Sequence, residues 1–348
     1  MKHRLIYLFC GIFITCILAS CKHAVELERI YGPEYASAPN DFYVAGNSFH
    51  ANPEVVNFKT GKVIFTASFT HRVSWTIEVK GLSSGAVKYI KGLSSSIGET
   101  NASWDGGSDN LIFFAKNEKC EAVLSFLGSS VTLSDTITIQ QVKVYDGILI
   151  QDFDGKGIIT ERFWYSYSDN QKTNKDEISF PAPDKRDYNL TALISNELPA
   201  VQGKWYLNVR GKDYNENWYV GGCGLYTENS FLGSNIYALS SDPDEIYLNA
   251  FVSSNFPYQT AISFSLSEPD DNIQDIFNIN MNIDWVGWKL LSIKLSSFSL
   301  SPNSKGDGKI NIKRLQGLGL APSPRAAGAE CDINVDYIIF TKGSPLKP

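Results

Sequence analysis

Apolar and polar residues alternate with a period of two in several short stretches of this sequence. In the clearest stretch, residues 73–79, Val, Trp, Ile and Val alternate with Ser, Thr and Glu. Successive side chains of a β-strand point to opposite faces, so this period predicts a strand with one buried and one solvated face. No helical period lasts for three turns, and the most helix-like piece, 271–276, is short. We therefore expect an all-β protein.

The region 41–146 is predicted to form an immunoglobulin-like sandwich. About seven short strands in about 100 residues are typical of that fold. Gly and Asp residues at 81–85 and 105–107 supply turns between the strands. The sequence around Trp75, Ala86 and Trp104 also resembles bacterial immunoglobulin-like modules of surface proteins, which implies a fold and no activity. The predicted strands are 63–69, 73–79, 111–115, 122–127 and 131–139.

The region 147–341 is predicted to form a second, larger two-sheet sandwich of the jelly-roll kind, followed by a tail at 342–348. Trp205 and Trp288 fall in phase with buried neighbours or at a strand start, and we expect them in the core. For Trp285, an exposed position is the alternative to a place in the core. Alternating stretches predict strands at 205–210, 246–252, 262–266, 291–295 and 333–339.

Three motifs of this second region occur in an informative order. An aspartate-rich opening holds Asp152 and Asp154, a middle motif runs from Trp285 to Phe298, and a closing motif Val-Asp-Tyr-Ile contains Asp336. Together they resemble the galactose-binding-like jelly rolls, a group that includes many carbohydrate-binding modules. The resemblance implies the fold more strongly than it implies a ligand, because one fold hosts many functions.

The first 20 residues have the layout of a secretory signal. Lys2 and Arg4 precede an apolar run, and small residues follow it. Leu-Ala-Ser before Cys21 resembles a bacterial lipobox, which implies that Cys21 is lipidated and that 21–40 is a tether. The alternative is an uncleaved transmembrane helix, but the run is short for a span of about 20 residues.

Composition narrows the possible partners. The formal net charge of −6 becomes more negative when Lys2 and Arg4 leave with the signal, which disfavours a nucleic-acid partner. Cys120, Cys223 and Cys331 remain besides Cys21, with no spacing typical of a zinc site. They are interpreted as single buried thiols, and a Cys223–Cys331 disulfide stays an open alternative.

Two aromatic segments of the second region are candidates for carbohydrate binding. Aromatic faces stack on sugar rings, while amides, carboxylates and Arg bond the hydroxyl groups. The segment 213–219 mixes these residue types without alternation, and 163–167 is the other group. Alternatively, the rings cap the sandwich edge or face its core. The candidate residues are Trp218, Tyr219, Asn217, Tyr214, Trp164 and Tyr165.

Asp152, Asp154 and Asp336 are candidate ligands of a structural calcium ion. The opening and closing strands are often paired in the fold that the motifs resemble, which would bring these acids together. Calcium takes six to eight oxygen ligands, so backbone carbonyls would supply the rest. The alternative is turn chemistry at Asp154 and an exposed strand acid at Asp336.

The layout resembles surface glycan-binding lipoproteins that work beside outer-membrane glycan importers in Bacteroidetes. It implies a lipid-anchored cell-surface protein of the outer membrane that binds an extracellular glycan without catalysis. The second region contains no His, which excludes a Ser-His-Asp triad there. A carbohydrate-active enzyme stays an alternative, although no motif assigns acid and base among Asp213, Glu216, Asp270 and Asp271. A structural or adhesive protein is the third hypothesis.

Overall fold

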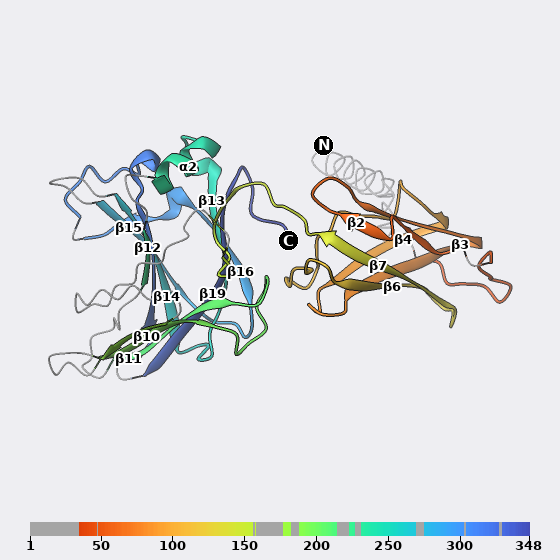
Figure 1. Cartoon of the computed structure of the whole chain (residues 1–348), viewed down its shortest axis with the longest axis horizontal. Coiled ribbons are helices and arrows are strands. Elements are labelled where there is room, and N and C mark those ends of the chain that lie inside the picture. Colours follow the sequence, from red (N-terminus) through yellow and green to blue (C-terminus); the bar gives the residue numbers. More distant parts are fainter. Residues whose placement is uncertain are drawn as a thin grey trace, which may run out of the picture.

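The structure is a computed structural model. It describes residues 35–46, 48–155, 157, 177–181, 188–213, 223–226, 231–268, 275–302, 304–326 and 329–348. Within these ranges the chain is overwhelmingly β-structure, arranged as an immunoglobulin-like sandwich followed by a jelly-roll sandwich, which confirms the predicted fold class (Figure 1). No helix among the described residues is long and apolar enough to cross a membrane.

The first sandwich is organised around β3 (Val63–Gly81), whose alternating residues form the predicted buried face. In the described residues the strand order is β1-β3-β6-β7-β2, and β4 and β5 also pair with β3. β2 pairs with β7 in parallel, and the other pairs are antiparallel. The remaining strands are β1 (His50–Asn52), β2 (Val55–Asn57), β4 (Val87–Ile97), β5 (Ser103–Trp104), β6 (Lys119–Phe126) and β7 (Thr132–Gln141).

Trp75 explains one local feature of this sandwich. Its indole is almost fully buried and lies across β4 at Gly92, where a Cβ atom would stand 2.2 Å from the Trp75 ring. The Trp75 Nε1–H donates to Ser94 Oγ at 2.9 Å, so the one polar atom of the ring is satisfied. The glycine in this lysine-bearing strand is therefore a packing requirement.

The second sandwich consists of two sheets, which we call the large sheet and the small sheet. In the described residues the large sheet has the order β16-β13-β19-β11-β10-β9, with β8 also on β19, and the small sheet has the order β12-β18-β14-β15-β17. The large-sheet strands are β8 (Ile148–Gln151), β9 (Glu177–Pro181), β10 (Tyr188–Ser195), β11 (Tyr206–Asp213), β13 (Ile246–Ser253), β16 (Lys289–Lys294) and β19 (Glu330–Lys342). The small-sheet strands are β12 (Cys223–Tyr226), β14 (Thr260–Glu268), β15 (Asp275–Asn282), β17 (Ser299–Leu300) and β18 (Gly317–Pro324).

The core of the second sandwich lies between these two sheets. Ile333 and Val335 of the large sheet pack in one buried cluster with Phe264 and Leu320 of the small sheet. Because strand side chains alternate, the residues between them face outward from each sheet. The outer faces of the two sheets are therefore the surfaces available for contacts with other molecules or with the first sandwich.

Several local predictions were wrong. Residues 111–115, predicted as a strand, form a loop, and the described end of the helix-like piece 271–276 belongs to β15. A helix that the periodicity did not predict, α2 (Phe231–Leu239), packs Gly233 tightly against the backbone of η4 (Ile312–Arg314). Short 3-10 turns also occur at η2 (Pro243–Glu245) and η3 (Leu295–Ser297).

Two segments predicted as tether and tail are packed where the structure describes them. The backbone N–H of Ala38 donates to the Leu127 carbonyl at 2.7 Å, so the end of the 21–40 segment joins the first sandwich. At the other end of the chain, Leu346 is buried and its N–H donates to Asn249 Oδ1 at 2.9 Å. Leu346 therefore anchors the tail to the large sheet.

Candidate functional site

The outer face of the small sheet is an uncharged surface of small and amide side chains. One row crosses all five strands in register: Gly224, Gly319, Ser265, Asn278 and Ser299. Two parallel rows lie beside it, Ala321-Ser263-Asn280 and Ser323-Ala261-Asn282. We call these three rows the polar face.

The polar face is exposed to solvent on the β15 and β17 side, whereas Gly224 and Ala321 at the β12 and β18 side are buried. Asn280 and Asn282 are exposed, whereas Ser263, Ser265 and Asn278 are half-buried. Asn278, Asn280 and Asn282 follow one another at every second residue of β15, about 7 Å apart. A Ser hydroxyl donates and accepts, and an Asn amide has both donors and an acceptor. This surface can therefore pair with a row of hydroxyl groups.

The predicted aromatic candidates cannot be placed on this surface. Trp164, Tyr165, Tyr214, Asn217, Trp218 and Tyr219 lie outside the described residues. The connection 214–222 joins the large sheet to the small sheet, which the chain reaches at Cys223 beside Leu320. No described residue of the three rows is aromatic, so a stacking ring at this surface would have to come from a connection.

Tyr258 is a described aromatic residue that sequence reasoning missed. It is 58% exposed and has a left-handed backbone conformation, with φ of 69°. Its N–H donates to the Ile283 carbonyl at 2.7 Å, directly beyond Asn282 at the end of the polar face. A bulky residue at positive φ is uncommon. No periodic signal marks a single loop tyrosine, which is why the sequence did not reveal it.

The three tryptophans singled out in the sequence are each partly buried. Trp205 and Trp285 pack against the core between the sheets, and Trp288 packs on the outer side of the large sheet. The Trp285 Nε1–H donates to the Val252 carbonyl at 3.2 Å, and that of Trp288 to the Pro199 carbonyl at 2.9 Å. These contacts give both indoles a structural role.

The two predicted thiols of this sandwich belong to different sheets. Cys223 begins β12 in the small sheet, and Cys331 lies in β19 of the large sheet. The Cys331 thiol is buried, with Sγ 3.6 Å from the Gly211 carbonyl oxygen.

The three predicted calcium ligands lie around one loop of the large sheet, residues 196–205. Asp336 Oδ2 accepts the N–H groups of Val201 and Gln202 at 2.8 and 3.0 Å. Asp154 accepts the Lys204 N–H, with Oδ2 at 3.0 Å. Asp152 is buried, and its Oδ1 accepts the N–H of Asp154 at 3.0 Å. Asp336 and Asp154 thus hold the loop by hydrogen bonds, and Asp152 holds the backbone of Asp154.

Asp336 occupies a gap in the pairing of β19. β11 pairs with β19 as far as Val335, and β8 begins to pair at Ile338. Asp336 is fully buried there, which contradicts the alternative of an exposed strand acid. Burial raises the pKa of Asp336 well above its ordinary value, and the nearby Asp154 charge raises it further. Asp336 Oδ1 is buried without a hydrogen-bond partner.

The acids do not by themselves complete a metal site. Among the residues that the structure describes, no group of three or more His, Cys, Asp or Glu side chains is placed to hold a metal ion. Asp336 Oδ1 is nevertheless a buried carboxyl oxygen without a hydrogen-bond partner near Asp154, and calcium binds carboxyl oxygens. Calcium at Asp152, Asp154 and Asp336 therefore stays a prediction that needs further oxygen ligands from the backbone.

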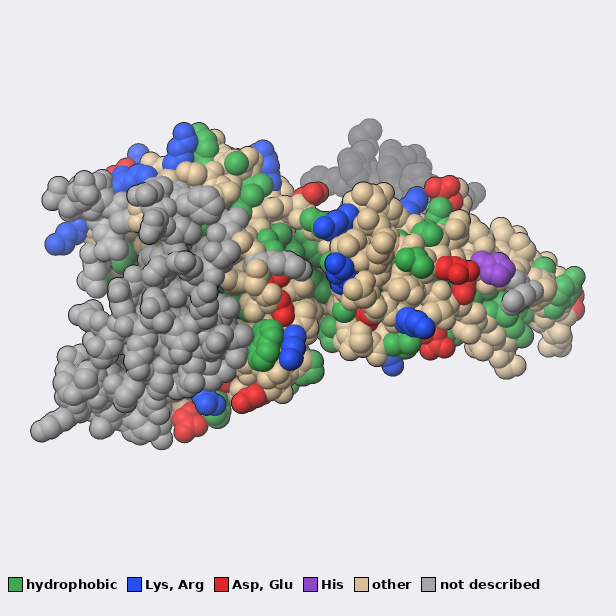
Figure 2. Space-filling view, in the orientation of Figure 1, with side chains coloured by type: hydrophobic (Ala, Val, Ile, Leu, Met, Phe, Trp, Pro, Cys, Tyr) green, Lys and Arg blue, Asp and Glu red, His purple; other side chains and the backbone are tan. Residues whose placement is uncertain are grey.

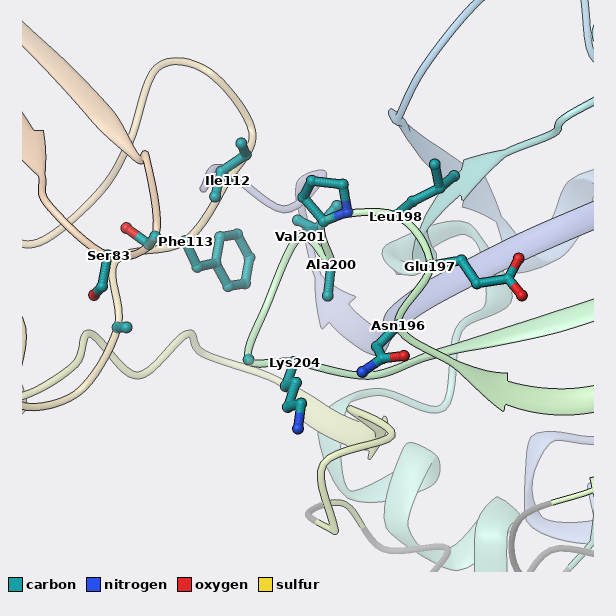
Figure 3. A pocket seen from close by; sticks show the side chains of 13 residues that line it. Ser83, Ile112, Phe113, Asn196, Glu197, Leu198, Ala200, Val201 and Lys204 are labelled. Carbon is teal, nitrogen blue, oxygen red and sulfur yellow. The ribbon is translucent and has the colours of Figure 1, made fainter.

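A groove of about 560 Å³ lies between the two sandwiches. Ser83 and Phe113 of the first sandwich line one side, and the 196–204 loop lines the other (Figure 3). The hydroxyls of Ser83 and Ser84 both donate to Glu118, which is buried behind them. These two hydroxyls hold the turn, and the polar side chains on the opposite wall of the groove are Asn196, Glu197 and Lys204.

The charged side chains of the described surface form no single-sign patch in the view of Figure 2. Basic and acidic side chains are interspersed over the described part of the face seen in Figure 2. Nucleic-acid binding depends on a concentrated basic surface, because each phosphate contact adds to an electrostatic affinity.

No family model and no curated protein matches this chain. Among solved structures, it is similar to a family 11 carbohydrate-binding module from Clostridium thermocellum in complex with a β-1,3-1,4-mixed-linked tetrasaccharide. That match has 12% identity and a TM-score of 0.36, and it covers 58% of this chain and 100% of the module.

Two further similar structures come from Bacteroides uniformis and Paenibacillus barcinonensis. SGBP-B from a complex xyloglucan utilization locus in Bacteroides uniformis has 13% identity and a TM-score of 0.35, covering 88% of this chain and 74% of that chain. The CBM22-1 xylan-binding domain of Paenibacillus barcinonensis Xyn10C has 14% identity and a TM-score of 0.29, covering 58% and 99%.

Proposed function

We propose that this protein binds an extracellular polysaccharide without catalysis, on the polar face of the small sheet. The observation that carries the proposal is the set of three registered rows that display Ser hydroxyls and Asn amides and no described charge. A saccharide presents neutral hydroxyl groups that both donate and accept, which such a surface matches. Rings from Trp164, Tyr165, Tyr214, Trp218 or Tyr219 would add stacking on the sugar faces.

The remaining parts of the chain have supporting roles in this proposal. Cys21 carries a lipid that anchors the protein to the outer membrane at the cell surface, and the first sandwich is a spacer. The captured glycan passes to an importer in the same membrane. Affinity at one site is modest because a shallow surface desolvates few contacts, and many anchored copies add avidity.

Calcium has a structural place in this proposal. Asp336, Asp152 and Asp154 would hold the ion, which would neutralise carboxylate charge that is buried beside the 196–205 loop. The ion would stabilise the loop and take no part in contact with the glycan.

The test is a binding screen of the mature chain against a panel of neutral and charged polysaccharides by affinity electrophoresis, followed by calorimetry on any that is retained. We expect a neutral polysaccharide to be retained and recovered unmodified. Replacing both Asn278 and Asn280 by Ala should weaken its binding about 30-fold, at about 1 kcal/mol for each lost hydrogen bond.

Asn196→Ala is the matched control for this experiment. Asn196 is exposed in the loop beside the groove, at a distance from the polar face, so its removal should leave affinity unchanged. Retention of no polysaccharide, or equal binding by the double variant and the control, would contradict the proposed function. Shortening of the polysaccharide would favour the enzyme alternative.

A further inference from the structure

The two sandwiches share a buried aromatic cluster. Phe113, from the 111–115 loop of the first sandwich, is only 8% exposed. Its ring lies 4.9 Å from Tyr337 and 5.5 Å from Phe251, both of the large sheet, in edge-to-face geometry. Tyr145, in the connection between the sandwiches, stacks on Phe113 at 5.1 Å. Aromatic pairs of this kind contribute beyond the apolar area that they bury.

Backbone contacts reinforce this cluster on two sides. The Phe113 N–H donates to the Val201 carbonyl at 2.7 Å, and Val201 is itself held by Asp336. The C-terminal tail packs Leu346 into the same cluster. The tail then reaches the first sandwich, where a Cβ atom on Gly107 would lie 2.9 Å from the Pro348 carbonyl oxygen. Besides the direct connection, the 111–115 loop, the 196–205 loop and the C-terminal tail thus take part in contacts between the two sandwiches.

The position of this cluster determines which way the polar face points. Phe251 and Tyr337 alternate with core residues of β13 and β19, so they lie on the outer face of the large sheet. The first sandwich docks on that face. The small sheet forms the opposite layer, so its outer face points away from the first sandwich, as the positions of β19 and β14 in Figure 1 show.

The first described residues, 35–38, pack on the first sandwich at the end opposite to the Phe113 cluster. Ala36 and Ala38 bond to Ser74 and Leu127, beside the pair Trp75–Phe126. The pair Gly81–Cys120 lies at the other end of the same two strands, next to Ser83 and Ser84 of the groove. Six residues of strand separate the two pairs, about 20 Å.

We infer that the two sandwiches form one rigid body in which the polar face is held at the end farthest from the anchored side, facing away from it. The Phe113 cluster is what fixes this orientation. The polar face is therefore held at a set angle to the first sandwich, which a flexible two-domain protein would not achieve; that this side is the anchored one rests on the proposed lipid at Cys21. This inference concerns geometry, and its test does not depend on which ligand the polar face binds.

The test measures distances between spin labels at two exposed positions of the full mature chain. Val131→Cys places a label near the β6–β7 turn of the first sandwich, and Lys309→Cys places one on the second sandwich. Single-label proteins correct for reaction at the native cysteines of the mature chain, Cys21, Cys120, Cys223 and Cys331. We expect one narrow distance distribution for the otherwise unaltered chain. A broad distribution would overturn the inference.

Two variants test whether the Phe113 cluster fixes the orientation of the two sandwiches. Phe113→Ala should broaden the distribution, and Leu346→Ala, which leaves the first sandwich untouched, should broaden it as well. Tyr89→Ala is the control, because Tyr89 is an exposed aromatic residue on β4, outside the cluster. If both variants fold and keep the narrow distribution, the assignment to this cluster is wrong. If Phe113→Ala fails to fold, Leu346→Ala decides the result alone.

Discussion

The carboxylate of Asp336 accepts the backbone N–H of Val201 at 2.8 Å inside a sheet, at the point where β19 exchanges one strand partner for another. Asp336 stays paired with Phe251 of β13 on one edge of β19, and its side chain holds the 196–205 loop near the other edge, where β11 ends and β8 begins. Because the Val201 carbonyl in turn accepts the Phe113 N–H, a single loop residue connects the closing strand of one sandwich to the other sandwich.

Loss of the Asp336 carboxylate should therefore be costly. Asp336→Ala leaves two N–H groups without an acceptor, and at about 1–3 kcal/mol for each we expect a loss of roughly 2–6 kcal/mol in the free energy of unfolding. Asp336→Asn keeps one acceptor oxygen and should cost less. Chemical denaturation measures both. Equal loss in the two variants would show that the carboxylate oxygens do not hold the loop.

Gly203 and Gly155 form a matched pair for testing the packing of the same loop. Both have positive φ, +70° and +97°. A Cβ atom at Gly203 would lie 1.9 Å from Asp154 Oδ2, whereas one at Gly155 would meet no atom within 4 Å. Gly155→Ala should cost about 1 kcal/mol of backbone strain. Gly203→Ala should cost at least about 2 kcal/mol more by thermal or chemical denaturation; similar losses would show that Asp154 moves aside freely.

Calcium should raise the melting temperature of the protein if Asp336 Oδ1 is one of its ligands. Ligand binding to the folded state alone stabilises it by mass action, about 2.7 kcal/mol at 100 times the dissociation constant. We expect the increase in calorimetry after chelator-treated protein is given calcium, and its absence in Asp336→Asn. An equal increase with magnesium would point to a non-specific effect of ionic charge.

The sequence was informative where periodicity carries the signal. The alternation at 73–79 correctly predicted a strand with one buried face. The alternation predicted at 333–339 holds only in part: Ile333 and Val335 pack between the sheets, whereas Tyr337 and Ile339 lie in the cluster on the outer side of the large sheet. The sequence pattern gave wrong predictions where tertiary contacts determine the local structure. Residues 111–115 are apolar because Phe113 enters an interdomain cluster, and an apolar run in a loop resembles a strand when only its composition is visible.

The polar face escaped sequence analysis for a related reason. Ser263 and Ser265 lie in a predicted strand, 262–266, but β15 with its Asn residues was not predicted as a strand. Only the register shows that these residues align across the small sheet. Register depends on pairing between distant strands, which a single sequence does not display. The acids were found by motif, but their common attachment to the 196–205 loop was not foreseeable, because loop backbone groups leave no mark in composition.

Glu268 should make the stability of the second sandwich depend on pH. Burial raises its pKa to about 7; a hydrogen bond from the Asn311 N–H and the Arg314 charge act in the opposite direction. The folded pKa lies above the unfolded value, so the folded state binds more protons between the two values. The contribution of Glu268 to the free energy of unfolding is then greatest below about pH 4.5 and is lost as pH rises through 7, a change of up to about 3 kcal/mol.

Glu268→Gln removes this titration while keeping an oxygen acceptor for Asn311. The unfolding free energy of the variant should change less between pH 5 and pH 8 than that of the unaltered chain, by denaturant titration at each pH. If the two proteins show the same pH dependence, Glu268 titrates near its ordinary value and the buried-carboxyl account is wrong.

Trp218→Ala should abolish retention of the glycan while leaving the melting temperature nearly unchanged, because we expect this indole to stack on a sugar and not to fill the core. An aromatic ring that stacks on a sugar contributes affinity through the contact of the two ring faces, and truncation to Ala removes that contact. Tyr258→Ala, at the described end of the polar face, should weaken binding in part. Tyr89→Ala, an exposed ring on the first sandwich, should change nothing. Affinity electrophoresis and calorimetry separate the outcomes: a collapse of stability in Trp218→Ala would place that indole in the core and remove it from the site.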